Sequence, residues 1–436
     1  MGVKEGRMVG FKFLHLADVH LDTPFQARTK DMRMFLRQAI RQAFQRAVDL
    51  AISEKVHALL IAGDLFDNQT LSFATEKFIV EQMKRLSEAK IPVFYAPGNH
   101  DPAGVMYRRS LIEWPDNVKV FNARQPETCP VYDRDGQLVA WITGAGHESP
   151  REKDNIIKDF PRARGSGIPH IGLVHAWVTG ARGEEEHDRY APCTLEDMAD
   201  KNYTYWALGH IHTRAHLSEQ PLVVYPGNLM GRHHGEEGLK GVYVVEIDDT
   251  GRVKAEFYPV APVCWTTFKV NNLSQVRTLA ELQEHMYRAI AEQAERHGHA
   301  DGHHETIARV LLEGPCFLYN QLRSQGTQGS IQEENIQVLE EYLSDVLGFR
   351  CVEVVLDGLT RPVVPDDYRG QPHVLGVALD ILEKARTDPQ VLLKLKPEVL
   401  AGCPGGDASE TIAYLQGLLE GLDYELAARL LGGELT

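Results

Sequence analysis

The sequence lacks paired cysteines. Its cysteines stand at positions 129, 193, 264, 316, 351 and 403, and no two of them form a C-x-x-C pair. This scattered spacing argues against a zinc knuckle and against a disulfide framework. We therefore expect the protein to work in a reducing environment.

Long apolar runs are also lacking. The N-terminus has no apolar signal core, and Gly6 stands where a myristoylation signal requires Ser or Thr. No later run is both long enough and sufficiently free of charge to cross a bilayer. We expect a cytoplasmic protein that does not associate with membranes.

A global excess of basic residues is missing as well. The 46 Lys and Arg residues are outnumbered by 61 Asp and Glu residues, which gives a net charge of −15. Proteins that grip phosphate backbones usually carry a basic surface, but bound divalent cations would reverse the sign of an acidic pocket. The acidity therefore does not exclude a nucleic-acid substrate.

What the sequence contains is the composition of a soluble globular protein, with 43% hydrophobic and 25% charged residues. Its 436 residues are too many for one ordinary core, so we expect more than one domain. Apolar runs at 11–17, 56–62 and 91–96 alternate with helical patterns at 32–53 and 71–89. Such an alternation predicts an α/β fold, in which ligands bind at the carboxyl ends of the strands.

Five apolar runs of the chain end in residues that can bind a metal. The donors delivered in this way are Asp18, His20, Asp64, Asn99, His175, His210 and His212. A single histidine beside an apolar run is more often a core or surface residue than a ligand. Because five strand ends share the pattern, we interpret the set as one metal site.

Seven donors are too many for one ion. They suit two ions that share a bridging carboxylate and keep open positions for water and substrate. Two such ions can bind the non-bridging oxygens of a phosphate and generate a hydroxide near neutral pH. The sequence therefore predicts hydrolysis of a phosphoester, and its mixed oxygen and nitrogen donors permit Mn, Fe or Zn.

The motifs resemble those of a known family in order and spacing. They are D-x-H at 18–20, G-D-x-x-D at 63–67, G-N-H-D at 98–101, His175 and G-H-x-H at 209–212, and together they resemble the calcineurin-like metallophosphoesterases. The forms H-L-A-D-V-H-L-D at 15–22 and Y-P-G-N at 225–228 look like the DNA-repair exonuclease branch, the SbcD-like and YhaO-like nuclease subunits. The resemblance implies a four-layer α-β-β-α sandwich over residues 1–262.

The resemblance also implies roles for individual residues. One divalent metal ion would be held by Asp18, His20 and His212, the other by Asn99, His175 and His210, with Asp64 bridging. His100 would donate a proton to the leaving oxygen or stabilise its charge. Asp67 would orient the His100 imidazole, with Asp101 as the competing candidate. The family usually works with manganese.

The function implied is that of a metal-dependent phosphodiesterase, a DNA repair exonuclease or endonuclease with a metal-bound hydroxide as nucleophile. The alternatives are a phosphatase or a cyclic-nucleotide or small-molecule phosphodiesterase of the same superfamily, and a non-catalytic scaffold subunit. Asn68 stands where phosphoprotein phosphatases have a phosphate-gripping arginine, which argues against the first alternative. The presence of all seven donors and of His100 argues against the second.

Contacts to DNA are predicted on the helical pattern at 32–53. It carries Arg33, Arg37 and Arg41 at a spacing of four residues, so that all three lie on one face. Such a stripe is more often a solvated helix face, but it is the best candidate in the chain for binding the phosphate backbone.

The last part of the chain predicts two further regions. Residues 263–360 alternate strand and helix patterns and form a small α+β domain, which by the resemblance would cap the site and steer DNA. The alternative is a packing module or the interface of a homodimer. The histidine-rich segment 297–304 is interpreted as an exposed loop rather than a metal site.

Residues 361–436 form a linker followed by short amphipathic helical patterns. By the resemblance, this helical segment would dock on an SMC-like coiled-coil ATPase. The alternative is that the helices pack on their own chain.

Overall fold

The computed structural model describes residues 10–26, 29–67, 71–104, 112–163, 165, 167–181, 188–296, 304–323, 331–362, 364–395, 408–419 and 422–431. The chain divides into two compact units. The first comprises residues 1–267, 294–309 and 348–352, and the second comprises 268–293, 310–347 and 353–436. The boundaries expected after residues 262 and 360 remain predictions.

The first sheet of unit 1 contains six strands in the order β12-β11-β1-β2-β3-β4. Their bounds are β1 Phe11–Leu16, β2 Ala58–Ile61, β3 Val93–Tyr95, β4 Val118–Val120, β11 Gly241–Ile247 and β12 Val253–Pro259. Strands β1 to β4 run parallel, whereas β11 and β12 are antiparallel to their neighbours. The carboxyl ends of β1, β2 and β3 therefore meet at one edge.

The second sheet also has six strands, in the order β5-β6-β7-β8-β10-β9. Their bounds are β5 Glu127–Tyr132, β6 Leu138–Ala145, β7 His170–His175, β8 Tyr205–Gly209, β9 Ala215–Glu219 and β10 Leu222–Tyr225. The four inner strands β6, β7, β8 and β10 are mutually parallel. Two antiparallel strands, β5 and β9, form the edges.

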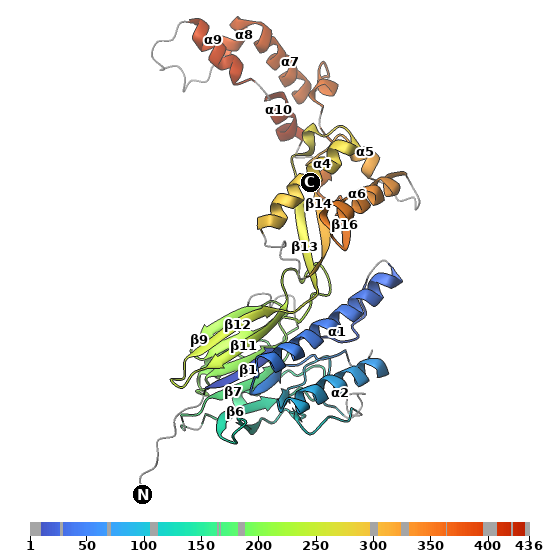
Figure 1. The fold of residues 1–436 in the computed structure, drawn as a ribbon. Coiled ribbons are helices and arrows are strands. Elements are labelled where there is room, and N and C mark those ends of the chain that lie inside the picture. Colours follow the sequence, from blue (N-terminus) through green and yellow to red (C-terminus); the bar gives the residue numbers. More distant parts are fainter. Residues whose placement is uncertain are drawn as a thin grey trace. The chain divides into compact units, whose positions relative to one another are not determined.

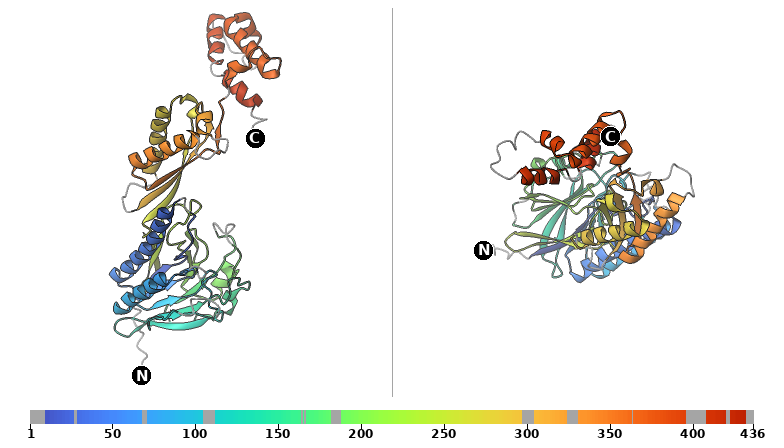
Figure 2. Two further views of the ribbon diagram at one scale, coloured as in Figure 1. Left: turned by 90° about the vertical axis from the view of Figure 1, so that its right-hand side faces the viewer. Right: turned by 90° about the horizontal axis from the view of Figure 1, so that it is seen from above.

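Two helices cover the outer face of the first sheet. They are α1 (Lys30–Ser53) and α2 (Phe73–Glu88), which lie side by side in both views (Figures 1 and 2). Each begins at a side chain that accepts a hydrogen bond from the first turn, Thr29 for α1 and Ser72 for α2. Apolar side chains on the inner face of the helices are buried against the sheet, Phe44 and Ile79 among them.

The space between the two sheets is a second core. Phe13 and Leu60 of the first sheet share this core with Leu173 and Tyr205 of the second. The outer face of the second sheet is covered by the short helix α3 (Leu195–Ala199) and the 3-10 helix η2 (Ile156–Asp159). The predicted α-β-β-α sandwich is confirmed, although its fourth layer consists of short elements.

Most of the helical residues described after residue 267 lie in the second unit. The three-stranded sheet β13-β14-β16, with bounds Val263–Val270, Glu305–Leu312 and Cys351–Val355, lies where the chain divides into its two units. Gln293 of α4 (Leu279–Arg296) accepts a hydrogen bond from Lys269 N, and Glu340 of α6 (Ile331–Leu347) accepts one from Val354 N. The strands β15 (Gly314–Pro315) and β17 (Leu359–Thr360) pair, and α5 spans Tyr319–Leu322.

Four helices close the chain, and their bounds are α7 Val374–Thr387, α8 Pro389–Lys394, α9 Ala408–Gly417 and α10 Leu422–Leu431. Leu382, Leu392 and Leu415 from three of them form one buried cluster, so these helices pack on each other. Among the described residues, no helix has the length and apolar character needed to cross a membrane.

Two sequence features lie outside the described residues. They are Asn68 and the histidine-rich segment up to His303. The predictions made for them are neither confirmed nor contradicted.

Candidate metal centre

The loops that follow β1 and β2 run side by side beyond the end of the sheet. The Asp18 N–H donates to the carbonyl of Gly63 (3.1 Å), and the His20 N–H donates to the carbonyl of Asp64 (2.9 Å). These bonds continue the parallel ladder of the two strands. They bring the side chains of Asp18, His20 and Asp64 close together.

The backbone is strained at the candidate ligands. Asp18, His20 and Asp64 have φ values of 49°, 52° and 49°, and His210 has a φ of 104°. A positive φ is uncommon outside glycine and concentrates at functional sites, where the surrounding structure must enforce it. The left-handed conformation turns each side chain off the end of its strand.

Gly98 permits the close approach of the loop after β3. A Cβ atom at this position would collide with the Asp64 carboxylate and with the His175 ring. Any other residue would therefore push the loop out, and with it Asn99.

Each candidate histidine uses one ring nitrogen to donate a hydrogen bond to an oxygen that can only accept. The four bonds are His20 Nδ1 to Asp67 Oδ1 (2.8 Å), His175 Nδ1 to Ala62 O (2.9 Å), His210 Nε2 to Asp188 O (2.7 Å) and His212 Nδ1 to Glu236 Oε1 (2.7 Å). The other nitrogen of each ring must then carry a lone pair in the neutral form. Burial lowers the pKa of His20, His175 and His212, which favours that form.

The lone-pair nitrogens gather in two groups. In one, His20 Nε2 lies 3.3 Å from His212 Nε2, which lies 3.8 Å from Asp18 Oδ1. In the other, Asn99 Oδ1 lies 2.9 Å from His175 Nε2 and 3.2 Å from His210 Nδ1. These groups contain the same residues as the two ligand sets expected from the sequence.

Asp64 lies between the two groups. Its Oδ2 atom is 3.8 Å from His20 Nε2 and 3.4 Å from His175 Nε2. Its other oxygen accepts the backbone N–H of His100 at 2.8 Å. This is the location that a bridging carboxylate requires.

The arrangement fits divalent cations. Two imidazole nitrogens that both carry lone pairs, facing each other at 3.3 Å, repel unless a cation lies between them or beside them. Burial and the nearby Asp64 charge raise the pKa of Asp18 well above its usual range. Cations beside both carboxylates would remove that repulsion. Carboxylate, amide and imidazole donors suit Mn, Fe or Zn ions.

His100 differs from the other histidines in its exposure. Its side chain is 45% exposed, and its Nδ1 lies 3.1 Å from Asp67 Oδ1. Burial lowers its pKa, but the charge of Asp64 and the hydrogen bond to Asp67 outweigh this effect and raise the pKa to about 9. In the metal-free protein, His100 is therefore an imidazolium that can reach solvent.

Asp101 has a different role from Asp67. Its buried carboxylate accepts hydrogen bonds from the backbone N–H groups of Gly98 (2.7 Å), Asp64 (3.2 Å) and Leu65 (2.5 Å), and from the hydroxyl of Tyr95. It joins the loop after β2 to the loop after β3. Of the two candidate carboxylates, Asp67 is the one beside the His100 ring.

Two residues near the centre escaped the sequence analysis. Glu236 is 6% exposed and accepts the hydrogen bond from His212, and Arg232 NH2 lies 2.7 Å from Glu236 Oε1. Burial raises the pKa of Glu236, but the His212 hydrogen bond and the Arg232 charge lower it far below its usual range. The only sequence signal was their position shortly after the Y-P-G-N motif, which carries no periodicity.

The predicted DNA-contact stripe on α1 is not uniform. Arg37 is exposed, but Arg41 NH2 donates to Asp22 Oδ1 (3.1 Å) and to Thr75 Oγ1 (2.7 Å). Arg41 therefore ties α1 to the D-V-H-L-D loop and to α2. A DNA contact by this face remains a prediction.

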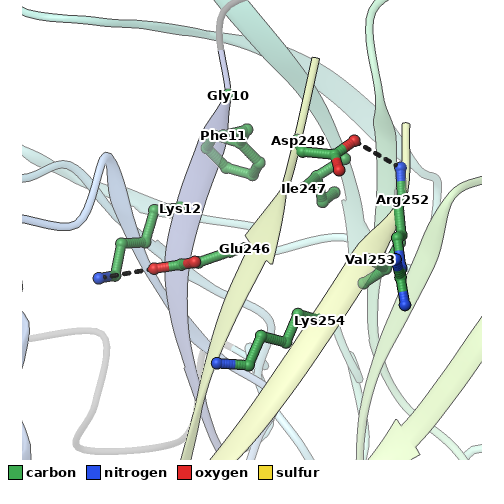
Figure 3. Close-up of a pocket in the computed structure, with 9 residues that line it drawn as sticks. All are labelled: Gly10, Phe11, Lys12, Glu246, Ile247, Asp248, Arg252, Val253 and Lys254. Carbon is green, nitrogen blue, oxygen red and sulfur yellow. Dashed lines mark hydrogen bonds and ion pairs between the residues drawn. The ribbon is translucent and has the colours of Figure 1, made fainter. Parts of the chain in front are cut away.

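A surface cavity of about 530 Å³ lies at the opposite end of β1 from the candidate ligands (Figure 3). It is lined by Gly10, Phe11, Lys12, Glu246, Ile247, Asp248, Arg252, Val253 and Lys254. Lys12 forms ion pairs with Glu246 and Glu54 (2.8 and 2.6 Å). Lys12 is thus already paired with carboxylates, and the cavity lies away from the candidate metal ligands.

The chain was compared with known proteins. The model of the calcineurin-like phosphoesterase family matches residues 11–214. The uncharacterized metallophosphoesterase YhaO of Bacillus subtilis is 35% identical over 58% of this chain and 61% of its own length.

Two archaeal relatives bear the name DNA double-strand break repair protein Mre11. The protein of Sulfurisphaera tokodaii is 27% identical over 47% of this chain and 49% of its own length. That of Methanopyrus kandleri is 24% identical over 92% of this chain and 88% of its own length. The matched regions thus span about half to three fifths of the first two relatives.

Removal of the Asp101 carboxylate should destabilise unit 1. Asp101→Ala leaves three buried N–H groups and the Tyr95 hydroxyl without their acceptor, which should cost at least about 3 kcal/mol. All five tryptophans lie in unit 1, so tryptophan fluorescence during urea unfolding of the metal-free protein reports on it. The exposed Asp200→Ala is the control and should change stability by about 0.5 kcal/mol at most. Equal stability of both variants would contradict the role of Asp101.

The pairing of His100 with Asp67 can be tested by NMR titration of histidine-labelled, metal-free protein. His100 should titrate with a pKa of about 9, so its contribution to stability should be complete below its ordinary pKa of 6.5 and disappear as the pH rises through 9. Asp67→Asn should lower this pKa, because it removes one negative charge and a hydrogen-bond acceptor. His100→Gln identifies the resonance. An unchanged titration in Asp67→Asn would disprove the pairing.

Proposed function

We propose that this protein is a two-metal phosphodiesterase that hydrolyses DNA, and the match of the calcineurin-like phosphoesterase family model to residues 11–214 supports this. The observation that carries the proposal is the convergence of seven donors from five strand ends beside an exposed imidazole. The family consists of hydrolytic enzymes, and this site retains a complete donor set. A scaffold subunit would have no need of it.

The two ligand groups define the proposed metal positions. Asp18, His20 and His212 would hold one ion, Asn99, His175 and His210 the other, and Asp64 would contact both. When bound, two divalent cations neutralise a phosphate and lower the pKa of water that attacks it. We propose manganese as the metal, with iron and zinc compatible with the same donors.

His100 would act as the proton donor. Its Nδ1–H donates to Asp67, so the Nε2–H is the group that can reach the substrate. As the bond between phosphorus and the leaving oxygen breaks, that proton passes to the oxygen, which departs as a neutral hydroxyl. General acid catalysis of this kind contributes about 10²–10⁴-fold. Asp67 keeps a proton on Nδ1 and stabilises the imidazolium form, whose other proton, on Nε2, is the one donated.

DNA as the substrate is supported by the names of the archaeal relatives, which are DNA double-strand break repair proteins. The exposure of His100 supports a substrate that approaches from solvent rather than one enclosed in a pocket. Arg33 and Arg37 on α1 remain the proposed contacts to its backbone. Arg41 is less suited, because it is paired with Asp22.

Purified protein with Mn²⁺ should degrade labelled linear DNA with defined single-stranded and double-stranded ends. His100→Ala should bind two metal ions per chain, measured by elemental analysis, and lose activity by about 10²–10⁴-fold. His285→Ala, in unit 2, is the matched control and should keep activity. If the protein hydrolyses a small phosphodiester such as bis-p-nitrophenyl phosphate but leaves DNA intact, the proposal that DNA is the substrate is wrong. Loss of metal in His100→Ala would make His100 a ligand.

A partner is proposed for the helices of unit 2. Val374, Val377 and Ile381 follow each other at helical spacing on α7 and are 73%, 53% and 42% exposed. An exposed apolar stripe of this kind suits the apolar seam of a coiled coil. We propose that the coiled coil of an SMC-like ATPase docks on it.

This docking can be tested by co-expression with the SMC-like ATPase of the same organism. Val377→Glu should abolish co-purification of the ATPase, because it places a charge in the apolar contact, and should leave DNA hydrolysis by the isolated chain unchanged. Val346→Glu, the same change at an exposed valine of α6, should retain the partner. Co-purification with Val377→Glu would exclude this stripe as the docking site.

A further inference from the structure

The Y-P-G-N motif at 225–228 supplies none of the seven candidate ligands. It begins at the end of β10, the neighbour of β8 in the second sheet. The hydroxyl of Tyr225 donates to the carbonyl of Ala176 (2.7 Å) and accepts the backbone N–H of Val178 (3.1 Å). The tyrosine thereby fixes the segment that follows His175.

The rest of the motif holds the backbone of two candidate ligands. The Asn228 N–H donates to the carbonyl of His212 (3.2 Å), and the Leu229 N–H donates to the carbonyl of Asp18 (3.3 Å). Gly227 has a φ of 76°, and a Cβ there would collide with the His212 carbonyl. The buried Lys240 Nζ donates to that same carbonyl at 2.9 Å. The His212 carbonyl is therefore held by two donors, the Asn228 N–H and the Lys240 ammonium.

The ring of His212 is held by Glu236. The same Glu236 Oε1 atom accepts His212 Nδ1–H (2.7 Å) and the guanidinium of Arg232 (2.7 Å). Its Oε2 atom accepts the side-chain amide of Asn228 (2.7 Å) and the backbone N–H of Arg232 (2.8 Å). Both oxygens of this buried carboxylate are thus engaged, and its position is fixed independently of the histidine.

We propose that Glu236, held by Arg232 and Asn228, is a positioning residue that sets the metal affinity of the position formed by Asp18, His20 and His212. An acceptor-only carboxylate at Nδ1 keeps the ring proton on that nitrogen, so that the Nε2 lone pair faces His20 and Asp18. Glu236 also increases the basicity of that nitrogen, which strengthens a metal bond. The inference rests on the proposed two-metal site but not on DNA as the substrate.

The other position is held differently. There, His175 and His210 each donate the ring N–H to a backbone carbonyl, that of Ala62 and that of Asp188, instead of to a carboxylate. Loss of the Glu236 charge should therefore lower the affinity for one ion and leave the affinity for the other unchanged. Loss of such an outer carboxylate typically reduces metal affinity about 10–100-fold.

Glu236→Gln tests this with little change of shape. Mn²⁺ is titrated against a competing chelator dye in the absence of substrate. The affinity for one of the two ions should fall about 10–100-fold, and the affinity for the other should stay unchanged. Excess Mn²⁺ should then restore hydrolysis of bis-p-nitrophenyl phosphate by Glu236→Gln. The neighbouring Glu237→Gln, an exposed residue of the same type, should bind both ions as the unaltered protein does.

Three results would overturn the proposal. The first is unaltered affinity for both ions. The second is equal weakening of both, together with a lower unfolding midpoint of the metal-free protein, which indicates a purely structural role. The third result concerns Arg232→Ala, which is used if Glu236→Gln does not fold. This variant removes the cation that holds Glu236, and an unaltered Mn²⁺ affinity of the variant would refute the assignment. A protein that passes this test but leaves DNA intact would disprove the DNA substrate alone.

Discussion

The whole site depends on lone pairs being held where they repel each other. His20 and His212 face each other through nitrogens 3.3 Å apart, and Asp18 and Asp64 are buried beside them. No part of a chain would adopt such an arrangement for the sake of stability, since the facing lone pairs repel each other and so do the two buried carboxylates. Only cations make it favourable, and the fold must hold the acceptors until the cations bind.

Two carboxylates outside the candidate ligand set hold the surrounding loops in place. Asp101 gathers three backbone N–H groups and a tyrosine hydroxyl on the side of the first sheet, and Glu236 gathers an imidazole, a guanidinium and an amide on the side of the second. Each anion is saturated with donors, so its burial is compensated. The positive φ values of Asp18 and His210 persist because these networks fix the loops on both sides.

The sequence predicted the strands that are buried on both faces, because their apolar runs are continuous and end abruptly at polar residues. It missed β5, β9 and β12, whose side chains alternate between exposed and partly buried positions and form no such run. The candidate ligands could be proposed because each lies at or shortly after the end of a strand. Glu236 could not, since it reaches His212 across 24 residues through a turn without periodicity. The spacing of Arg33, Arg37 and Arg41 predicted one solvent-facing stripe, but a spacing cannot show that Asp22 lies within reach of Arg41.

Charge couples the proposed metals to the proposed substrate. The chain carries a net charge of −15, so a polyanion such as DNA is repelled at long range, and more strongly at low salt. Two divalent cations would place four positive charges in the one region where Asp18, Asp64 and Asp67 concentrate negative charge. The site should therefore attract phosphate only when both ions are bound. Linkage makes the coupling reciprocal, so that a bound phosphate tightens the metals by the same factor. Glu236 contacts a candidate ligand of only one of the two ions, and would set how tightly that ion binds. By the same coupling, it would also set the affinity for a phosphate substrate that it does not contact.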